Sequence, residues 1–507
     1  MTTEPMTPLA EQLRHAAARL RAGEVDGAEA EARTLLEAHP GHPHVLHLRG
    51  LILLARGHVQ GAAAHLARAI AAAPAEGEFH LALARVLQQQ GRSEPARERA
   101  REAARRLPEA AEPWVVLGDL AVETGAAEEA AACYEEGIAR QPEHWGAWNN
   151  LGLIRKTQGR LEEAEEALRR ATALLPGEVE GWVNLAQTLL LAGRYPEGWA
   201  AYERRLELPM MRAYLAGVPP GLPRWRGEVV PGARLLLVGE QGYGDTLQFV
   251  RFLPGLRAAG MRLRLLCAPE LMELLAFNQV ADEVAALSRN HLAESVAAGA
   301  AGCDAWLPLA SLPGILGVSA AAIPAPIPYL RADPDLLPPW RERRLRDGGG
   351  AGLVVGLSWQ GTALHGRDPA RRRSCRLAEL APLAQAAPGA LFVSLQQGEG
   401  ADQAADPPPG MRLVDWSGEL REFSDTAAAL ESLDLVVTID TALAHLAGAM
   451  VKEGWVLLPF APDWRWGLTG DSAGWHPTLR LFRQSSPGDW THPIRRIAER
   501  LRMGATG

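Results

Sequence analysis

A constant spacing of 34 residues runs through the first two hundred residues of the chain. A repeat of this length indicates a stack of similar structural units rather than one compact core. Small residues at two fixed positions of each repeat let two helices pack closely. Proline, which has no N–H, ends the second of these helices. Four kinds of residue keep the interval: Pro40, Pro74, Pro108, Pro142 and Pro176; Trp114, Trp148 and Trp182; Gly50, Ala84, Gly118, Gly152 and Ala186; Ala28, Ala62, Ala96, Ala130 and Ala164.

The repeat has the sequence features of a helical hairpin. The pattern W-x2-L-G occurs at Trp114–Gly118 and Trp148–Gly152, and together with the period it resembles the tetratricopeptide family. We therefore predict a solenoid of about six repeats over residues 1–212, with degenerate repeats at its ends. Because such arrays present a concave groove to peptides and proteins, the resemblance implies a protein partner.

Two asparagines, Asn150 and Asn184, share one phase on the first helix of their repeats. In O-linked N-acetylglucosamine transferases, an asparagine ladder at the matching phase grips the substrate backbone, so this pair is a candidate for the repeat groove. The ladder has only two rungs here, since the earlier repeats carry Val116, Ala82 and Leu48. Local capping or pairing of the two side chains is the alternative.

The charge and cysteine pattern exclude several classes of protein. The 507 residues carry a formal net charge of −8, which favours neither nucleic acid nor an anionic membrane as a partner. No apolar run reaches the roughly 18 residues of a membrane span, and we find no secretion signal. The cysteines lie far apart without metal-ligand spacing, which fits a reduced compartment and predicts a cytoplasmic protein without a metal site: Cys133, Cys267, Cys303 and Cys375.

The second half of the chain alternates predicted strands and helices. After a proline-rich linker over 213–232, the apolar run Leu235–Val238 leads into a glycine turn and a helix, and Arg262–Cys267 reads as a second strand. This pattern is typical of a parallel α/β sheet. We predict one Rossmann-like lobe over 233–335, a linker over 336–350 and a second lobe over 351–507. Its strands are expected at 353–359, 391–395, 435–439 and 455–458.

The glycine turn Gly239–Asp245 lacks the lysine of a phosphate-binding Walker loop, because Asp245 stands in its place. It also lacks the dinucleotide fingerprint G-x-G-x-x-G. Asp245 is expected at a helix N-terminus, where the dipole favours its charged form. A charged carboxylate in a cleft can accept a proton from a hydroxyl, and a simple helix cap is the alternative role.

A second polar cluster follows a strand of the second lobe. Asp440 and Thr441 are expected where this strand ends and a helix begins, a position whose N–H groups favour phosphate. His445 lies one helical turn further and can face the same cleft. In α/β proteins with parallel strands, ligands bind at the carboxyl ends of the strands, so these residues are predicted to line the site.

The region from about residue 233 to 500 resembles the heptosyltransferase-like family-nine glycosyltransferases, in particular the bacterial branch joined to tetratricopeptide repeats. The resemblance implies a GT-B fold and an inverting, metal-independent transfer from a nucleotide-sugar, without a cofactor, to a protein or glycan acceptor recruited by the repeats. The matching segments lie in both lobes: 239–246, 373–374, 394–396, 425–428, 440–449, 463–466 and 480–484.

The resemblance also implies roles for single residues. Asp245 matches the proposed base, and Gly242 and Gly244 belong to the loop that the acceptor approaches. Matching residues of the second lobe are expected to bind the donor: Arg373, Gln396, Asp440, Thr441 and His445. Arg373 would offset the charge of the leaving diphosphate, as a reaction without a metal requires.

The chain departs from the family pattern at four places, namely the basic loop 365–373, 451–454, 473–477 and Gln397, where the family has lysine. These departures leave a second hypothesis open: a non-catalytic tetratricopeptide scaffold with a degenerate transferase-like domain. The tryptophans of the C-terminal region are open to two interpretations, since they could stack on a sugar or base or lock the C-terminal tail onto the first lobe: Trp464, Trp466, Trp475 and Trp490.

Overall fold

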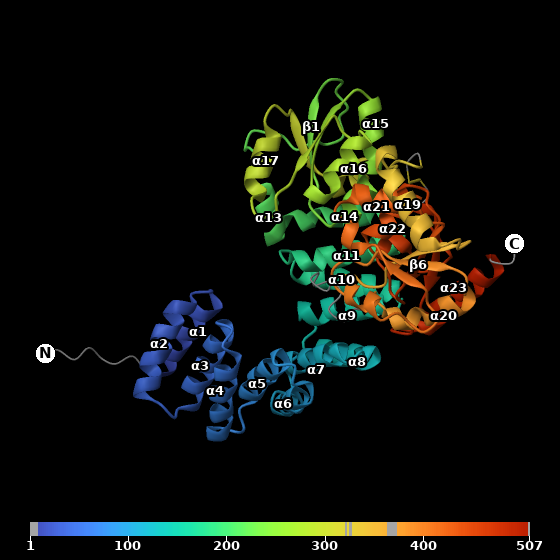
Figure 1. Cartoon of the computed structure of the whole chain (residues 1–507). Helices are drawn as coiled ribbons and strands as arrows, with labels where there is room; N and C mark the ends of the chain where they lie inside the picture. The colour runs from blue at the N-terminus through green and yellow to red at the C-terminus, as the bar shows by residue number, and fades with distance from the viewer. Residues whose placement is uncertain (1–8, 320–321, 324–326, 362–372, 505–507) are drawn as a thin grey trace. The chain divides into compact units, whose positions relative to one another are not determined.

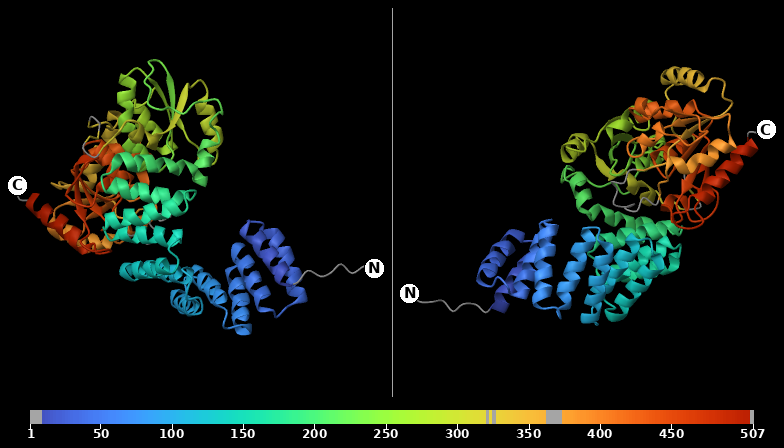
Figure 2. Two further views of the ribbon diagram at one scale, coloured as in Figure 1. Left: turned by 180° about the vertical axis from the view of Figure 1, so that it is seen from behind. Right: turned by 60° about the horizontal axis from the view of Figure 1, so that its bottom comes forward.

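The computed structural model describes residues 9–319, 322–323, 327–361 and 373–504. The chain consists of two compact units, residues 1–177 and residues 178–507. The described part of the first unit is helical, whereas the second unit contains two β-sheets with helices packed on them (Figures 1 and 2).

The first unit is a series of helical hairpins with the predicted 34-residue period. Glycines with a left-handed backbone join the two helices of each hairpin, for example Gly23 at φ 82° and Gly57 at φ 75°, a conformation that side chains disfavour. The hairpins are α1 (Leu9–Arg21) with α2 (Val25–Ala38), α3 (Pro43–Ala55) with α4 (Val59–Ala72), α5 (Gly77–Gln89) with α6 (Ser93–Arg106), α7 (Glu112–Glu123) with α8 (Ala127–Arg140), and α9 (Trp145–Thr157) with α10 (Leu161–Leu174).

The small periodic residues allow the close helix packing that the sequence predicts. A Cβ atom on Gly118 would lie 2.4 Å from the Tyr134 ring, and one on Gly152 would lie 2.5 Å from Leu168. The periodic alanines Ala62 and Ala96 are fully buried. The second helix of each hairpin ends two residues before its periodic proline, because the residue preceding proline disfavours helical geometry. The predicted helical solenoid is therefore confirmed.

A sixth hairpin belongs to the second unit. Its helices are α11 (Val179–Leu191) and α12 (Tyr195–Tyr202), followed by the short helices η1 (Glu203–Glu207) and α13 (Pro209–Leu215). The first compact unit thus ends at Gly177, one hairpin before the predicted end of the array at residue 212.

The first sheet of the second unit has four parallel strands in the order β3-β2-β1-β4. Helices α13 and α17 lie along one side, and α14, α15 and α16 along the other (Figures 1 and 2). The predicted strands at 235–238 and 262–267 are present. The elements are β1 (Arg234–Val238), α14 (Tyr243–Phe249), α15 (Leu253–Ala258), β2 (Arg262–Cys267), α16 (Met272–Phe277), β3 (Glu283–Ala286), α17 (Leu292–Ala300), β4 (Ala305–Pro308) and α18 (Leu312–Ile315).

The second sheet has seven strands in the order β10-β11-β9-β8-β5-β6-β7, parallel except for β10. All four predicted strands of this lobe are present, and the C-terminal part of the chain is an α/β structure. Its elements are β5 (Val354–Leu357), α20 (Ala381–Ala386), β6 (Leu391–Ser394), β7 (Leu413–Asp415), α21 (Phe423–Glu431), β8 (Leu435–Ile439), α22 (Ala442–Ala449), β9 (Gly454–Leu458), β10 (Ser472–Ala473), β11 (His476–Arg483) and α23 (Thr491–Gly504).

Residues 336–350, the predicted linker, contain helix α19 (Leu337–Gly348). This helix packs on the second lobe, since Trp340 is buried against Trp416 with ring centroids 5.4 Å apart. Arg344 adds an ion pair to Asp434 at 2.7 Å. The predicted linker is thus largely a helix.

Candidate functional site

The two polar motifs lie against each other within the second unit. The glycine turn follows β1, Asp440 follows β8, and helix α14 contacts α22. Gly244 makes this contact possible, because a Cβ atom there would lie 2.7 Å from Cδ2 of His445. Gly242 has no such requirement, since a Cβ atom would meet only Asp245 at an ordinary 3.6 Å.

Asp245 is the third residue of α14, and both of its oxygens have protein partners. Oδ2 accepts a hydrogen bond from the Gly242 N–H at 3.2 Å, which is a helix-capping contact. Oδ1 pairs with the Arg465 guanidinium. About one fifth of the side chain is exposed. The structure therefore gives Asp245 a capping contact and leaves it accessible at the glycine turn.

Arg465 connects the two lobes. Its guanidinium pairs with Asp245, donates to Asp463 at 2.8 Å and donates through Nε to Gln248 at 2.5 Å, and it stacks on Trp464 at 4.2 Å. Burial opposes the charge, but the two carboxylates outweigh burial and raise the pKa of Arg465 above its ordinary value. Arg465 lies inside the matched segment 463–466, yet our sequence analysis gave it no role.

Asp440 lies at the carboxyl end of β8, among these charges. Burial and then the neighbouring Asp463 raise the pKa of its carboxyl group to about 6, while Arg373 and Arg465 oppose that rise. Thr441 is the N-cap residue of α22 and shares a hydrogen bond with Thr438 at 3.3 Å between hydroxyl oxygens. Asp440 thus changes charge near neutral pH, at the start of a helix.

His445 is a buried residue of α22 with 5% of its surface exposed. Its ring stacks on Trp466 with centroids 5.4 Å apart, and Nδ1 lies 3.1 Å from Nε2 of His476. Burial and the charge of Arg465 lower the pKa of His445 to about 3. The imidazole is therefore neutral at physiological pH and can act only as a neutral hydrogen-bonding group.

Gln396 holds the ends of β5 and β6 together. Its Oε1 accepts hydrogen bonds from the Ser358 hydroxyl and from two backbone N–H groups of the same loop, at 2.9–3.2 Å. Its Nε2 donates to three backbone carbonyls at 2.8–3.1 Å. These contacts involve both polar atoms of the side chain, so Gln396 shapes the loop of the site, and its direct contact with the donor stays a prediction.

Arg373 lies beside the loop that follows β5, where a Cβ atom on Gly361 would be 3.1 Å from its Nε. It is close enough to Asp440 to act on the pKa of that carboxyl group. The structure therefore brings Arg373, Asp440 and Arg465 together at the carboxyl edge of the second sheet. The neighbouring residues Arg371 and Arg372 lie outside the described residues.

The sixth hairpin and the short helix η1 that follows it contact the glycine turn, which could not be predicted from the sequence. Arg205 forms a fully buried ion pair with Glu240 at 2.6 Å, and Tyr202 bonds Gln241 at 3.0 Å. The indole of Trp475 donates to the Tyr195 hydroxyl at 3.0 Å and stacks on that ring. Trp464 and Trp475 therefore pack on α12, and Trp475 also contacts the first lobe through Phe249 and Phe252. Stacking of these tryptophans on a sugar or base stays a prediction.

The two asparagines of the predicted groove lie in different compact units. Asn150 donates to Asp119 at 3.1 Å, and the same carboxylate accepts from the Tyr134 hydroxyl at 2.8 Å. The local-pairing alternative therefore describes Asn150 in this structure. Asn184 lies on α11, and its carbonyl accepts from the Thr188 hydroxyl at 2.9 Å.

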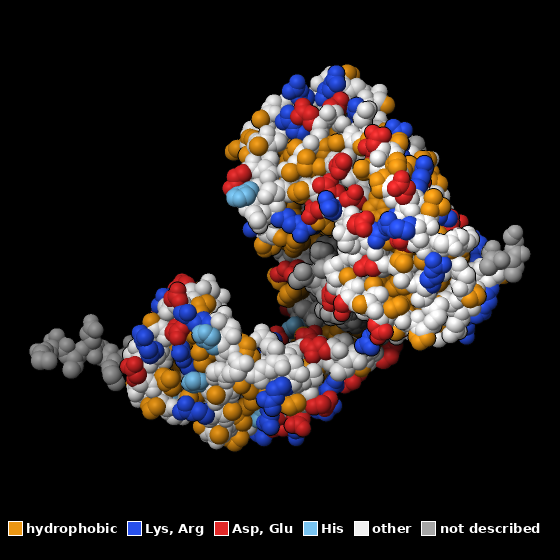
Figure 3. All heavy atoms as spheres, in the orientation of Figure 1, with side chains coloured by type: hydrophobic (Ala, Val, Ile, Leu, Met, Phe, Trp, Pro, Cys, Tyr) orange, Lys and Arg blue, Asp and Glu red, His pale blue; other side chains and the backbone are white. Residues whose placement is uncertain are grey.

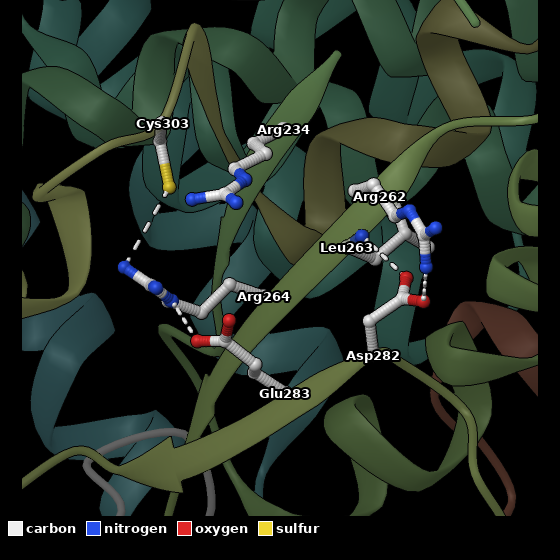
Figure 4. A pocket seen from close by; sticks show the side chains of 7 residues that line it. All are labelled: Arg234, Arg262, Leu263, Arg264, Asp282, Glu283 and Cys303. Atoms are coloured by element: carbon white, nitrogen blue, oxygen red, sulfur yellow. Dashed lines mark hydrogen bonds and ion pairs between the residues drawn. The ribbon is translucent and has the colours of Figure 1, made fainter. Parts of the chain in front are cut away.

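A surface hollow lies at the opposite end of the first sheet (Figure 4). Arg234, Arg262 and Glu283 line it and are the first residues of β1, β2 and β3. Arg262 pairs with Asp282 at 3.2 Å, and Arg264 pairs with Glu283 at 2.6 Å. Because ligands of parallel α/β sheets bind at the carboxyl ends of the strands, this hollow is separate from the candidate site.

In the described ranges, no helix is long and apolar enough to cross a membrane, and no group of three histidine, cysteine or acidic side chains is arranged to hold a metal ion. On the face in view, acidic and basic side chains are interspersed over both units (Figure 3).

The family model for the tetratricopeptide repeat matches residues 13–76, 81–136, 115–179 and 155–208. The N-terminal part of the chain is a tetratricopeptide array. Protein FlbA of Caulobacter vibrioides is 28% identical over 319 residues, which cover 60% of this chain and 52% of that protein. The chain thus spans about half the length of this relative.

Parts of the chain are also similar to solved structures. A thermophilic TPR protein of Thermus thermophilus is 25% identical, covers 33% of this chain and 91% of its own, and has a TM-score of 0.30. The pilF protein of Pseudomonas aeruginosa is 14% identical, with coverages of 39% and 90% and a TM-score of 0.35.

Proposed function

We propose that the second unit is a glycosyltransferase of the GT-B type, which moves a sugar from a nucleotide-sugar to a protein or glycan acceptor recruited by the tetratricopeptide array. One observation carries the proposal. The glycine turn with Asp245 and the helix start with Asp440, Thr441 and His445 come from two parallel sheets and pack against each other. Parallel α/β sheets bind ligands at this edge.

In the proposed reaction, Asp245 accepts the proton of the acceptor hydroxyl. The hydroxyl oxygen forms a bond to the anomeric carbon of the sugar, while the bond from that carbon to the diphosphate oxygen breaks. The electron pair leaves with the diphosphate, and the single displacement inverts the anomeric centre. Asp245 is suited to this step because its carboxylate lies at the glycine turn and is partly exposed.

The leaving diphosphate gains negative charge in this step, and the second lobe offers groups that stabilise it. Arg373 supplies a cation beside the loop after β5, and the N-terminus of α22 supplies backbone N–H groups. His445 contributes a neutral hydrogen bond because burial keeps its ring uncharged. The reaction needs no metal in this scheme, which agrees with the inverting, metal-independent chemistry of the family that the sequence resembles.

Ligand binding and transfer test the proposal separately. We expect nucleoside diphosphates of one base, and the matching nucleotide-sugar, to raise the melting temperature of the full chain, since a ligand that binds only the folded state stabilises it. Asp245→Asn should keep this shift and lose nucleotide release from the sugar donor by two orders of magnitude or more, about the effect of losing a general base. Asp335→Asn, at an exposed carboxylate, is the matched control.

The competing function is a tetratricopeptide scaffold whose α/β unit is not catalytic. One observation favours it: both oxygens of Asp245 already have protein partners. The thermal-shift panel separates the two functions. If a well-folded sample shows no shift with uridine, guanosine, cytidine, thymidine or adenosine diphosphates or their sugar conjugates, the scaffold is the correct assignment.

A further inference from the structure

Three buried side chains from three elements form a line that leads to the candidate site. They are Arg251 in the short helix η2 (Val250–Phe252), His476 at the start of β11 and His445 in α22. Arg251 Nη2 lies 3.4 Å from His476 Nδ1, and His476 Nε2 lies 3.1 Å from His445 Nδ1. Their exposed fractions are 3%, 0% and 5%.

The direction of the hydrogen bonds along this line follows from the guanidinium. Arginine has only N–H donors and no acceptor, so Nδ1 of His476 must accept and carries no proton. His476 is neutral, because burial together with His445 and Arg251 lowers its pKa well below the ordinary value. Its single proton is therefore on Nε2 and is donated to Nδ1 of His445.

The same argument places the proton of His445. Because its Nδ1 accepts from His476 and the ring is neutral, the proton is on Nε2. The Nε2 atom lies beside the glycine turn, since a Cβ atom on Gly244 would be 3.3 Å away. Among the described residues, the structure gives this N–H no hydrogen-bond partner.

The surroundings of His476 are shaped to hold it in this position. A Cβ atom on Gly448 would lie 2.3 Å from Nδ1 of His476, so glycine at this point of α22 makes room for the ring. Arg251 is fixed from the other side, because it also donates to the Trp475 carbonyl at 2.7 Å and to the Tyr329 hydroxyl at 2.9 Å.

We propose that Arg251 and His476 are positioning residues that hold His445 in its Nε2–H tautomer, so that it donates a hydrogen bond to a diphosphate or sugar oxygen of the nucleotide-sugar. The ligand part of this inference rests on the proposed function, whereas the tautomer part does not. Nitrogen NMR of histidine-labelled full chain tests the tautomer alone, with the His445 signals assigned from His445→Gln. We expect a protonated Nε2 and an unprotonated Nδ1 in the absence of nucleotide, and a protonated Nδ1 would overturn the inference.

Two variants of His476 that differ by one methylene group test the role of this residue in nucleotide binding. In His476→Gln, the side chain can still accept from Arg251 and donate to His445, while the shorter side chain of His476→Asn keeps the contact to Arg251 but does not reach His445. We expect His476→Asn to weaken the Kd of the nucleoside diphosphate that shifts the wild type by about 3- to 10-fold, the value of one hydrogen bond. His476→Gln should stay within about twofold of the wild type.

The outcomes separate this inference from the proposed function. Equal losses in both variants, or none in either, would contradict the positioning role. An Nε2–H tautomer in a protein that binds none of the five nucleoside diphosphates would instead refute the proposed function, and with it the ligand of His445, while the hydrogen-bonded line itself would stand.

Discussion

At the scale of single residues, the candidate site is an arrangement of charges around Arg465. This arginine pairs with Asp245 and Asp463 and acts on Asp440. A cation shared by several carboxylates keeps them close together in a partly buried place, where like charges would otherwise repel each other. Because the partners come from distant parts of the chain, such as Asp245 and Arg465, sequence motifs place them near one site without revealing their contacts.

The raised pKa of Asp440 predicts a dependence of stability on pH. The pKa of its carboxyl group is about 6 in the folded state, above the ordinary value of 3.8, so the folded state holds the proton more tightly than the unfolded state. Ionisation therefore costs stability, with a cost that is absent below about pH 4, grows up to about pH 6 and is constant above it. Asp440→Asn removes this cost.

Urea unfolding of the Asp440→Asn variant and the wild type at several pH values measures the cost. We expect the free energy of unfolding of the variant, relative to the wild type, to rise by up to about 3 kcal/mol between pH 4 and pH 7. A difference that stays flat over this range would mean that Asp440 ionises in the folded state as it does in the unfolded chain.

At the scale of elements, the strands of the second sheet depend on side chains that bridge their ends. Gln396 connects the loop after β6 to the loop after β5 through four hydrogen bonds and makes two more within its own loop. Replacing it by leucine would leave several buried backbone groups without partners, and each costs about 1–3 kcal/mol. We expect Gln396→Leu to lower the free energy of unfolding by roughly 3 kcal/mol or more.

The neighbouring Gln397 provides the control for this prediction. Its side chain is exposed and donates one hydrogen bond, to the Leu420 carbonyl. Gln397→Leu should therefore cost about 1 kcal/mol at most in the same urea titration. A loss of nucleotide binding by Gln396→Leu without a loss of stability would point back to the direct donor contact predicted from the sequence.

Strands could be predicted from the sequence where apolar residues form a long, continuous run. Continuous apolar runs identified β1, β5, β6, β8 and β9, which are buried along nearly their whole length. The strands β3 and β11 were not predicted. The sequence of β3 is Glu-Val-Ala-Ala and none of its residues is fully buried, and the second residue of β11 is proline. Such strands depend on pairing with neighbours, and sequence patterns do not show that pairing.

At the scale of the whole molecule, the boundary between the compact units at 177 and 178 predicts which fragments fold. A fragment of residues 178–507 keeps α11 and α12 with their contacts to the glycine turn. A fragment of residues 213–507 loses them, which leaves Glu240 as a buried carboxylate without Arg205 and exposes Trp464 and Trp475. Breaking a buried ion pair alone costs about 3–5 kcal/mol.

Thermal unfolding of the two fragments checks this prediction. We expect the longer fragment to unfold cooperatively and to bind the same nucleotide as the full chain, and the shorter one to aggregate or unfold without a sharp transition. Equal stability of both would mean that the sixth hairpin is dispensable for the α/β unit.

The position of the sixth hairpin limits which repeats can be gained or lost during evolution. Its helices α11 and α12 complete the 34-residue pattern and also form part of the wall behind the glycine turn. Repeats before Gly177 can therefore be gained, lost or exchanged as whole units without altering the groups that hold Asp245. On the proposed function, partner recognition and chemistry could then change independently, with the sixth hairpin retained beside the glycine turn.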